Sequence, residues 1–509
     1  MPEQPQRSVG RNVAAASLFM IGLRMTFRVI GVFSSLLLIR LLLPTDFGLV
    51  GVAMAVAGAL ETLTETSFGL ALIRLPTMTR QHLDTAWTFQ IIRGTLIGVL
   101  IATTAGFAAE WMREPRVVPI MWVIAATSFA QGFENIGMVE FRRNLRFGRI
   151  FEIRLYSKLI GLLVMLPAAA IFHSYWALVA GIVTLRLSNM LLSYVWHPFR
   201  PRLSLECWRE LFHFSKWLLF GNVLWVIESI APTMLFGRIV GPTGVGLYQV
   251  SYQVASLPAS EIAAPIREPI YSGYAKLLGQ MAKLRQQYVD GFGVLLLVIT
   301  PMSIGIALTG DLLTPVGLGQ QWIAASALIA PCALFALLDA IAHFPGNLFV
   351  VLNRQKGYII TLAAMLCIRF PLFIWVGAEW GMVPAIYVLV ATAGLAAIVW
   401  TYSVMRLLDL GLRELFAPIW RTGVSTLVMT TVVLAFTDLH AGGDPYRVVL
   451  LRLLAVSAFG AAVQIGTQVL LWLVSGAPEG PETKLLGLAR TFVRKLYSMR
   501  LRRRSAPAS

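Results

Sequence analysis

The feature that most constrains this chain is a succession of apolar runs, each roughly 18 to 27 residues long and bounded by charges or by Pro and Gly. Hydrophobic residues make up 57% of the sequence and charged residues only 13%. In lipid the backbone must satisfy its own hydrogen bonds, which favours helices over open structure. The sequence therefore predicts an all-α polytopic membrane protein with about 14 transmembrane helices. The expected centres lie near Arg24, Gly58, Leu96, Ser128, Ile160, Arg186, Trp225, Ala255, Thr300, Leu338, Arg369, Val390, Met429 and Gly460.

The distribution of Lys and Arg predicts the orientation. With the N-terminus inside, about thirty basic residues fall in cytoplasmic loops and about five outside. Both termini are then cytoplasmic. This bias also accounts for most of the formal net charge of +17, so no nucleic-acid partner is needed.

Two segments of the chain are near copies. Residues 40–49 read RLLLPTDFGL and residues 238–247 read RIVGPTGVGL, about 198 positions later. As a local feature, the shared Pro-Thr-x-x-Gly is a tight turn that caps a helix hairpin. As a repeat, with six spans between its copies, it predicts two six-helix lobes related by a pseudo-twofold axis along the membrane normal. The expected parts are a cytoplasmic tail (1–12), an N-lobe (13–197), a linker (198–213), a C-lobe (214–405), two further spans (416–474) and a basic cytoplasmic tail (482–509).

No enzyme motif is present. The sequence has no phosphate-binding G-x-x-x-x-G-K-[ST] loop, no His-Glu-x-x-His pair and no G-x-S-x-G elbow. Its three cysteines have no paired spacing, and its six histidines are scattered. We therefore expect a secondary transporter without catalytic residues, cofactor or metal.

Charged residues inside the expected spans are the candidate functional groups. A Lys or Arg at mid-bilayer costs about 2.5 to 3.5 kcal/mol, so five of them are expected to face water or a partner. The basic candidates for an anion site are Arg24, Arg28, Arg186, Arg369 and Lys158. The acidic candidates, for charge pairing or cation coupling, are Glu61, Glu65, Glu134, Glu228, Glu261 and Asp339.

Structural roles compete with binding for these groups. Arg24 and Arg28 lie one helical turn apart, as do Glu61 and Glu65 on the next span, so the two pairs could form salt bridges. An ion pair between Asp339 and Arg369, and a snorkelling Lys158, are comparable alternatives.

The run RLLLPTDFGL after the first span and SFGLALIR at residues 67–74 resemble the polysaccharide transporter branch of the multidrug/oligosaccharidyl-lipid/polysaccharide superfamily, the Wzx-type flippases. Within that branch the chain looks most like exporters of the colanic acid and xanthan type. The resemblance implies a bacterial inner-membrane protein that translocates undecaprenyl-pyrophosphate-linked oligosaccharide repeat units. Its expected partners are membrane lipids and a polysaccharide polymerase and co-polymerase. The second copy of the motif has Gly244 in place of Asp46, which weakens a mechanistic role for Asp46.

Other functions remain open. A multidrug or metabolite antiporter of the MATE branch shares a twelve-span core, but exporting organic cations favours acidic, aromatic lobes. A lipid II flippase is similarly basic, and a non-transporting assembly scaffold is a third alternative. After Pro481, apolar residues recur at helical spacing among basic ones, which predicts an amphipathic helix on the anionic leaflet.

Overall fold

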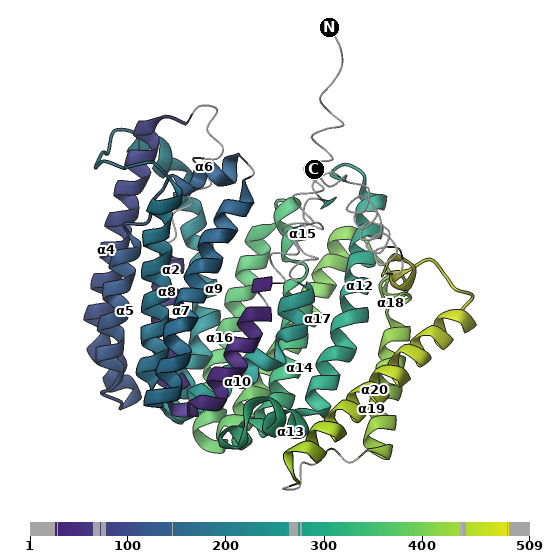
Figure 1. The fold of residues 1–509 in the computed structure, drawn as a ribbon. Coiled ribbons are helices and arrows are strands. Elements are labelled where there is room, and N and C mark those ends of the chain that lie inside the picture. The colour runs from purple at the N-terminus through teal and green to yellow at the C-terminus, as the bar shows by residue number, and fades with distance from the viewer. Residues whose placement is uncertain are drawn as a thin grey trace, which may run out of the picture. The chain divides into compact units, whose positions relative to one another are not determined.

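The computed structural model describes residues 26–27, 29–64, 72, 78–144, 146–263, 273–274, 277–437, 439, 444–485 and 487. All regular elements in these ranges are helices (Figure 1). Within them, nine helices are long and apolar enough to cross a membrane, and Val29–Leu41, Val117–Gln131 and Trp420–Phe436 are shorter apolar helices. Every expected centre from Gly58 to Gly460 lies in a described helix, whereas Arg24 lies outside the described residues. The prediction of an all-α polytopic membrane protein is confirmed.

The chain divides by packing into unit 1 (Met1–Gln249) and unit 2 (Val250–Ser509). Helix α9 packs with unit 1 because it lies against α2 and α4, where Trp111 Nε1 donates to the carbonyl of Met234 (3.2 Å). The division into lobes at residues 198–213 stays a prediction. Besides Val29–Leu41, unit 1 contains α2 (Pro44–Leu63), α4 (Arg80–Met112), α5 (Val117–Gln131), α6 (Met138–Arg143), α7 (Phe147–Phe172), α8 (Tyr175–Trp196), α9 (Trp208–Ile239) and the start of α10 (Pro242–Ala255).

Unit 2 holds the remaining helices around a core of buried aromatic and aliphatic side chains from α12, α14 and α17, including Tyr288, Phe292 and Trp400. Its elements after α10 are a π-helix (Ala259–Ala263), α12 (Met281–Leu308), α13 (Gly310–Leu313), a second π-helix (Thr314–Leu318), a 3-10 helix (Gln320–Ala325), α14 (Ser326–His343), α15 (Gly346–Val351), α16 (Gln355–Trp380), α17 (Met382–Leu408), α18 (Leu412–Phe416), α19 (Trp420–Phe436) and α20 (Tyr446–Val474).

Helices of unit 1 pack closely where small residues meet, and they expose large apolar side chains outward. A Cβ on Gly94 of α4 would lie 2.8 Å from the Cα of Gly132, just after α5, so the two backbones are almost in contact. Leu163 on α7 is 73% exposed and Phe107 on α4 is 68% exposed. Such exposure suits lipid rather than water as the surrounding solvent.

The two copies of the duplicated motif begin two helices and pack against each other within unit 1. Pro44 starts α2 and Pro242 starts α10. A Cβ on Gly48 would lie 1.7 Å from the Pro242 carbonyl oxygen, and a Cβ on Gly246 would lie 1.8 Å from the Pro44 carbonyl oxygen. The contact is therefore reciprocal, and only glycine fits at either position.

Asp46 has a structural role in the first copy. One carboxylate oxygen accepts from the backbone N–H of Leu43 (3.0 Å), and the other accepts from the N–H of Tyr175 (3.1 Å). Asp46 thus satisfies an N–H at the start of α2 and another at the start of α8. These contacts explain why an acidic residue stands here without requiring it to bind a substrate.

Candidate functional site

A charge pair between a buried arginine and a half-buried glutamate lies inside unit 1. Arg186 is halfway along α8 and only 8% exposed. Its Nη1 donates to Glu61 Oε1 of α2 (2.9 Å), to Ser128 Oγ (3.1 Å) and to Gln131 Oε1 of α5 (3.0 Å). Three helices therefore meet at one guanidinium nitrogen. This geometry is expected for a desolvated charge, which has to be both paired and hydrogen-bonded.

The charge pair borders a polar cavity of about 380 Å³ between α2, α4 and α5. Arg93 reaches the cavity from α4, and its Nη2 donates to the backbone carbonyl of Glu61 (2.6 Å). Arg93 thus lies against α2 inside the unit. The polar and charged residues that line this cavity are Glu61, Gln90, Arg93, Ser128, Gln131, Glu134, Asn135 and Arg142.

Glu134 lies between two cavities. It follows α5 in the turn before α6, and it lines both the 380 Å³ cavity and an adjoining one of about 160 Å³. Its Oε1 accepts from Asn189 Nδ2 of α8 (3.2 Å), and its carbonyl accepts from Gln90 Nε2 (3.0 Å). The smaller cavity also contains Arg142 and Arg154. Polar groups therefore continue from the Arg186 pair toward the end of unit 1 that carries α6, which we call the basic end.

Lys158 stands apart from this cluster. Its Nζ donates to the carbonyl of Phe27 (3.1 Å), and it lies 5.7 Å from the centroid of the Phe27 ring. Lys158 thus connects α7 to the chain at the first apolar helix. Snorkelling and anion binding both stay predictions for this residue.

In unit 2, Arg369 and Asp339 lie on α16 and α14. Arg369 is 4% exposed, donates from Nε to Thr392 Oγ1 of α17 (3.0 Å) and lies over the ring of Phe335 at 5.9 Å. Asp339 Oδ1 lies 3.4 Å from His343 Nε2, one turn along α14. His343 Nδ1 in turn contacts the Tyr358 hydroxyl at 3.0 Å.

Two further acidic candidates lie on α9 and on the first π-helix. Glu228 is half-buried on α9, and Glu261 is half-buried in the first π-helix, where its Oε1 accepts from Ser260 Oγ (3.1 Å). Arg24, Arg28 and Glu65 lie outside the described residues, as does most of the basic tail after Leu485.

Sequence reasoning missed one buried ion pair. Arg421, in the first turn of α19, makes a bidentate contact with Glu482 through Nε (2.8 Å) and Nη2 (3.0 Å). Gln468 Nε2 also donates to Glu482 (3.0 Å), and Ser425 Oγ donates to Gln468 (2.7 Å). The available signal was the pair Gln464 and Gln468, two amides one turn apart in an apolar run.

Comparison with known proteins indicates the family to which this chain belongs. Residues 37–327, more than half of the chain, match the sequence profile of the family described as Polysaccharide biosynthesis protein. The chain belongs to this family. The family resemblance inferred from the sequence is thereby confirmed, while the likeness to colanic acid and xanthan exporters stays a prediction.

Individual relatives of this family member are distant in sequence. It is 20% identical to the teichuronic acid biosynthesis protein TuaB of Bacillus subtilis (strain 168) over 354 residues, 69% of this chain and 70% of the relative. It is 19% identical to the lipopolysaccharide biosynthesis protein WzxC of Escherichia coli (strain K12), over 67% of this chain and 69% of the relative.

Two solved structures of transporters share the fold of this polysaccharide biosynthesis family member. The lipid II flippase MurJ in an inward closed conformation matches with a TM-score of 0.67 and 12% identity, over 89% of this chain and 98% of MurJ. A multidrug resistance MATE family transporter in an inward-facing conformation matches with a TM-score of 0.54 and 15% identity, over 75% of this chain and 94% of that one. The chain is therefore a multi-pass membrane protein with a transporter fold.

Proposed function

We propose that the protein is a flippase that moves undecaprenyl-pyrophosphate-linked oligosaccharide repeat units across the bacterial inner membrane for surface or exopolysaccharide synthesis. Membership of the polysaccharide biosynthesis family supports a role in polysaccharide synthesis. The transporter fold supports translocation as the activity. Alternating access would expose a basic site first to one side of the membrane and then to the other.

The observation that carries the proposal is the ion pair between the buried Arg186 and the half-buried Glu61, beside a polar cavity in an apolar bundle. Replacing a buried ion pair with well-packed apolar residues is often neutral or stabilising, so stability alone does not account for the pair. A guanidinium matches phosphate oxygens in a fork geometry, which suits an anionic substrate.

We assign the pyrophosphate to the basic set Arg24, Arg28, Arg186, Arg369 and Lys158. In this assignment Glu61 holds Arg186 while no substrate is present, and a pyrophosphate competes with the carboxylate for the guanidinium. Glu65, Glu134, Glu228, Glu261 and Asp339 adjust the pairing of these cations, and a polymerase and co-polymerase take up the translocated unit.

The test separates the structural role of the pair from its functional role. The double variant Glu61→Gln, Arg186→Met removes both charges together, so no unpaired charge is buried and the protein is expected to fold. Polymer export in a strain lacking its own flippase is expected to be lost, whereas the thermal stability of the purified protein is retained. Normal export by this variant would remove the pair from the mechanism.

A matched control neutralises a pair on the same unit whose arginine is exposed. Arg116 and Glu114 form a salt bridge of 2.8 Å in the turn between α4 and α5, and the double variant Glu114→Gln, Arg116→Gln is expected to export normally. The same assay applied to Arg24→Ala and Arg28→Ala tests those two residues.

A lipid II flippase is the second candidate, favoured by the likeness to MurJ. Rescue of cells depleted of their essential lipid II flippase would support it. Failure to rescue, together with restored polymer export, supports the polysaccharide function.

A further inference from the structure

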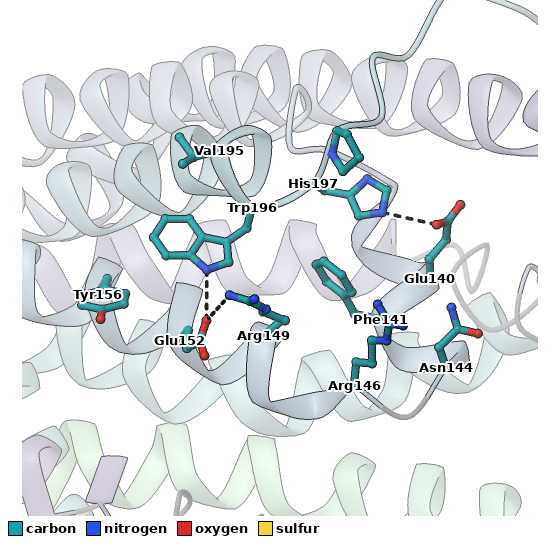
Figure 2. A pocket seen from close by; sticks show the side chains of 11 residues that line it. Glu140, Phe141, Asn144, Arg146, Arg149, Glu152, Tyr156, Val195, Trp196 and His197 are labelled. Atoms are coloured by element: carbon teal, nitrogen blue, oxygen red, sulfur yellow. Dashed lines mark hydrogen bonds and ion pairs between the residues drawn. The ribbon is translucent and has the colours of Figure 1, made fainter.

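A second and larger pocket, which we call the rim pocket, is open to the surface at the basic end of unit 1 and has a volume of about 790 Å³. Its walls come from α6, the first turns of α7 and the last turn of α8 (Figure 2). The volume lies within the range of ligand pockets, about 300 to 1,000 Å³. None of the charged residues that the sequence analysis proposed as site candidates lines the rim pocket.

One wall of the rim pocket is an aromatic surface held by hydrogen bonds. Trp196 Nε1 donates to Glu152 Oε2 (3.1 Å), and Arg149 Nη1 donates to the same oxygen (3.0 Å), as Figure 2 shows. The rings of Trp196 and Tyr156 lie 5.7 Å apart. The indole is therefore fixed next to a guanidinium and a carboxylate, with its orientation set before any ligand arrives.

The opposite wall repeats this mixture of groups. His197 Nε2 lies 3.3 Å from Glu140 Oε2, and the Phe141 ring lies 5.1 Å from the imidazole. Asn144 and Arg146 complete the lining with an amide and a second guanidinium. The formal charges of Glu140 and Glu152 balance those of Arg146 and Arg149, so the pocket offers donors and acceptors without a net charge.

This chemistry selects for a sugar rather than a phosphate. A pyranose ring has apolar C–H faces that can pack on Trp196, and hydroxyl groups that can both donate to carboxylates and accept from guanidinium or amide N–H groups. A phosphate would instead favour a net positive site rich in donors, because it is negatively charged and mainly accepts hydrogen bonds.

The pocket also has an open flank that suits a lipid-linked sugar. Val195 is 73% exposed and Tyr156 is 47% exposed, and both belong to apolar membrane-spanning helices. A lipid chain could therefore stay in the bilayer while its sugars occupy the pocket.

We propose that the rim pocket binds sugar residues of the lipid-linked oligosaccharide at the cytoplasmic face, before the pyrophosphate enters the translocation pathway. The proposal rests on the proposed flippase function and adds a sugar-recognition site to it. Selection among oligosaccharides then takes place partly outside the Arg186 site.

The test is photocrosslinking in cells with p-benzoyl-phenylalanine in place of Tyr156. Cells that make the complete lipid-linked repeat unit are expected to give a crosslinked protein that carries the oligosaccharide. The same probe in place of Ile171, which is exposed at the other end of α7, is the matched control and should give none. An equal crosslink in cells that make the lipid carrier without sugar would show a lipid site and overturn the proposal, as would no crosslink at position 156.

The contribution of the indole is tested on the same background. Trp196→Ala is expected to lower the crosslink yield roughly tenfold, as when one aromatic anchor of a binding site is truncated. Trp196→Phe keeps a ring and should retain most of the yield. Trp176→Ala, on the same helix at its other end, should leave the yield unchanged. Melting temperatures of the purified variants identify any that fail to fold, and unchanged crosslinking by a folded Trp196→Ala protein would contradict the proposal.

Expression of the unmodified chain in a strain lacking its own flippase distinguishes the flippase hypothesis from the rim pocket hypothesis. If it restores export but position 156 does not crosslink to sugar, the rim pocket proposal fails and the flippase function stands. If it restores no export, the proposed function itself fails.

Discussion

Arg186 and Arg369 show what a buried guanidinium requires. Both were candidates for an anion site, and both have protein acceptors in place: Glu61, Ser128 and Gln131 around Arg186, and Thr392 beside Arg369. A phosphate that takes the nitrogen atoms already in use, Arg186 Nη1 and Arg369 Nε, has to displace these acceptors. Substrate binding and rearrangement of the side chains are therefore linked events in the proposed mechanism.

The contact between Arg369 and Thr392 gives a residue-scale prediction. Thr392→Val keeps the shape of the side chain but removes the oxygen that accepts from Arg369 Nε. We expect a loss of about 1 to 3 kcal/mol in stability, because a buried charged donor loses an acceptor. Thermal unfolding of the purified protein measures the loss. Thr361→Val is the control, since the exposed Thr361 hydroxyl bonds only the Gly357 carbonyl of its own helix, and equal losses for both variants would contradict the prediction.

Charged positions were easy to find from the sequence, but their partners were not. A charge in an apolar run is visible without any structure, and so Arg186 and Glu61 were both identified. That they pair with each other depends on the packing of α2 against α8, across 125 residues of chain. Uncharged partners such as Gln131 gave no signal. The Arg421–Glu482 pair was missed because Glu482 lies after the last apolar run.

At the scale of elements, the start of α2 packs on the start of α10 through two glycines. Gly48→Ala should lower stability by about 1 to 3 kcal/mol, the cost of overpacking, because its Cβ would overlap the Pro242 carbonyl oxygen. Thermal unfolding is again the measurement. Gly58→Ala, on the same helix, is the control because a Cβ there meets nothing within 4 Å. The close contact would be disproved if both variants were equally stable.

The segment after α20 is fastened to unit 2 by charge and by packing. Glu482 is held by Arg421 of α19, and Lys484 pairs with Asp290 of α12. A Cβ on Gly293 of α12 would lie 2.5 Å from Pro481 Cγ, so the segment lies directly on that helix. The beginning of the predicted basic tail is thus part of the folded unit.

This attachment predicts a pH dependence. Burial alone would raise the pKa of the Glu482 carboxyl. The hydrogen bonds from Arg421, from a backbone N–H and from Gln468, together with the charge of Arg421, outweigh burial and hold that pKa below its usual range. A lowered folded-state pKa adds stability above the unfolded-state value, about 4.3, and this stability is lost as the pH falls through the lower folded-state pKa. Glu482→Gln should therefore lose about 3 kcal/mol at pH 7, where Arg421 is left unpaired.

The measurement is the melting temperature of wild type and Glu482→Gln from pH 7 downward. The difference between them should shrink once the pH falls below about 4.3. Glu479→Gln, an exposed position three residues earlier, is the control and should follow the wild type. A difference independent of pH would show that the carboxylate charge is not what fastens the segment.

For the whole molecule, the helical fold was predictable because lipid leaves the backbone few alternatives. Apolar runs located the helices, and the described elements agree with them. Breaks in regular structure were harder: the run expected near Ala255 is α10 followed by a π-helix, and the α12–α14 connection contains a π-helix and a 3-10 helix. These irregularities depend on tertiary packing and on prolines such as Pro315, whose effect on neighbouring turns is not fixed by composition.

The flippase function predicts that membrane potential alone can drive transport. A pyrophosphate with roughly two negative charges gains about 2.3 kcal/mol per charge per 100 mV when it leaves an inside-negative cell. Proteoliposomes with an imposed potential and no proton or sodium gradient are expected to flip lipid-linked oligosaccharide. If they require a cation gradient, and Asp339→Asn or Glu228→Gln then abolishes flipping, coupled antiport through these carboxylates is the better explanation.

The reciprocal contact between the motif copies also constrains how the duplicated gene could diverge. Gly48 and Gly246 each occupy space bounded by the other copy's backbone, so neither can change without a clash in its counterpart. Among the described residues, the Asp46 carboxylate accepts hydrogen bonds from Leu43 and Tyr175, which both belong to the first half of the sequence. Its equivalent was therefore able to become Gly244, or to begin as glycine, while the glycine pair and the two prolines stayed alike. Differences between the halves are expected where contacts stay within one half, and identity where the two copies touch.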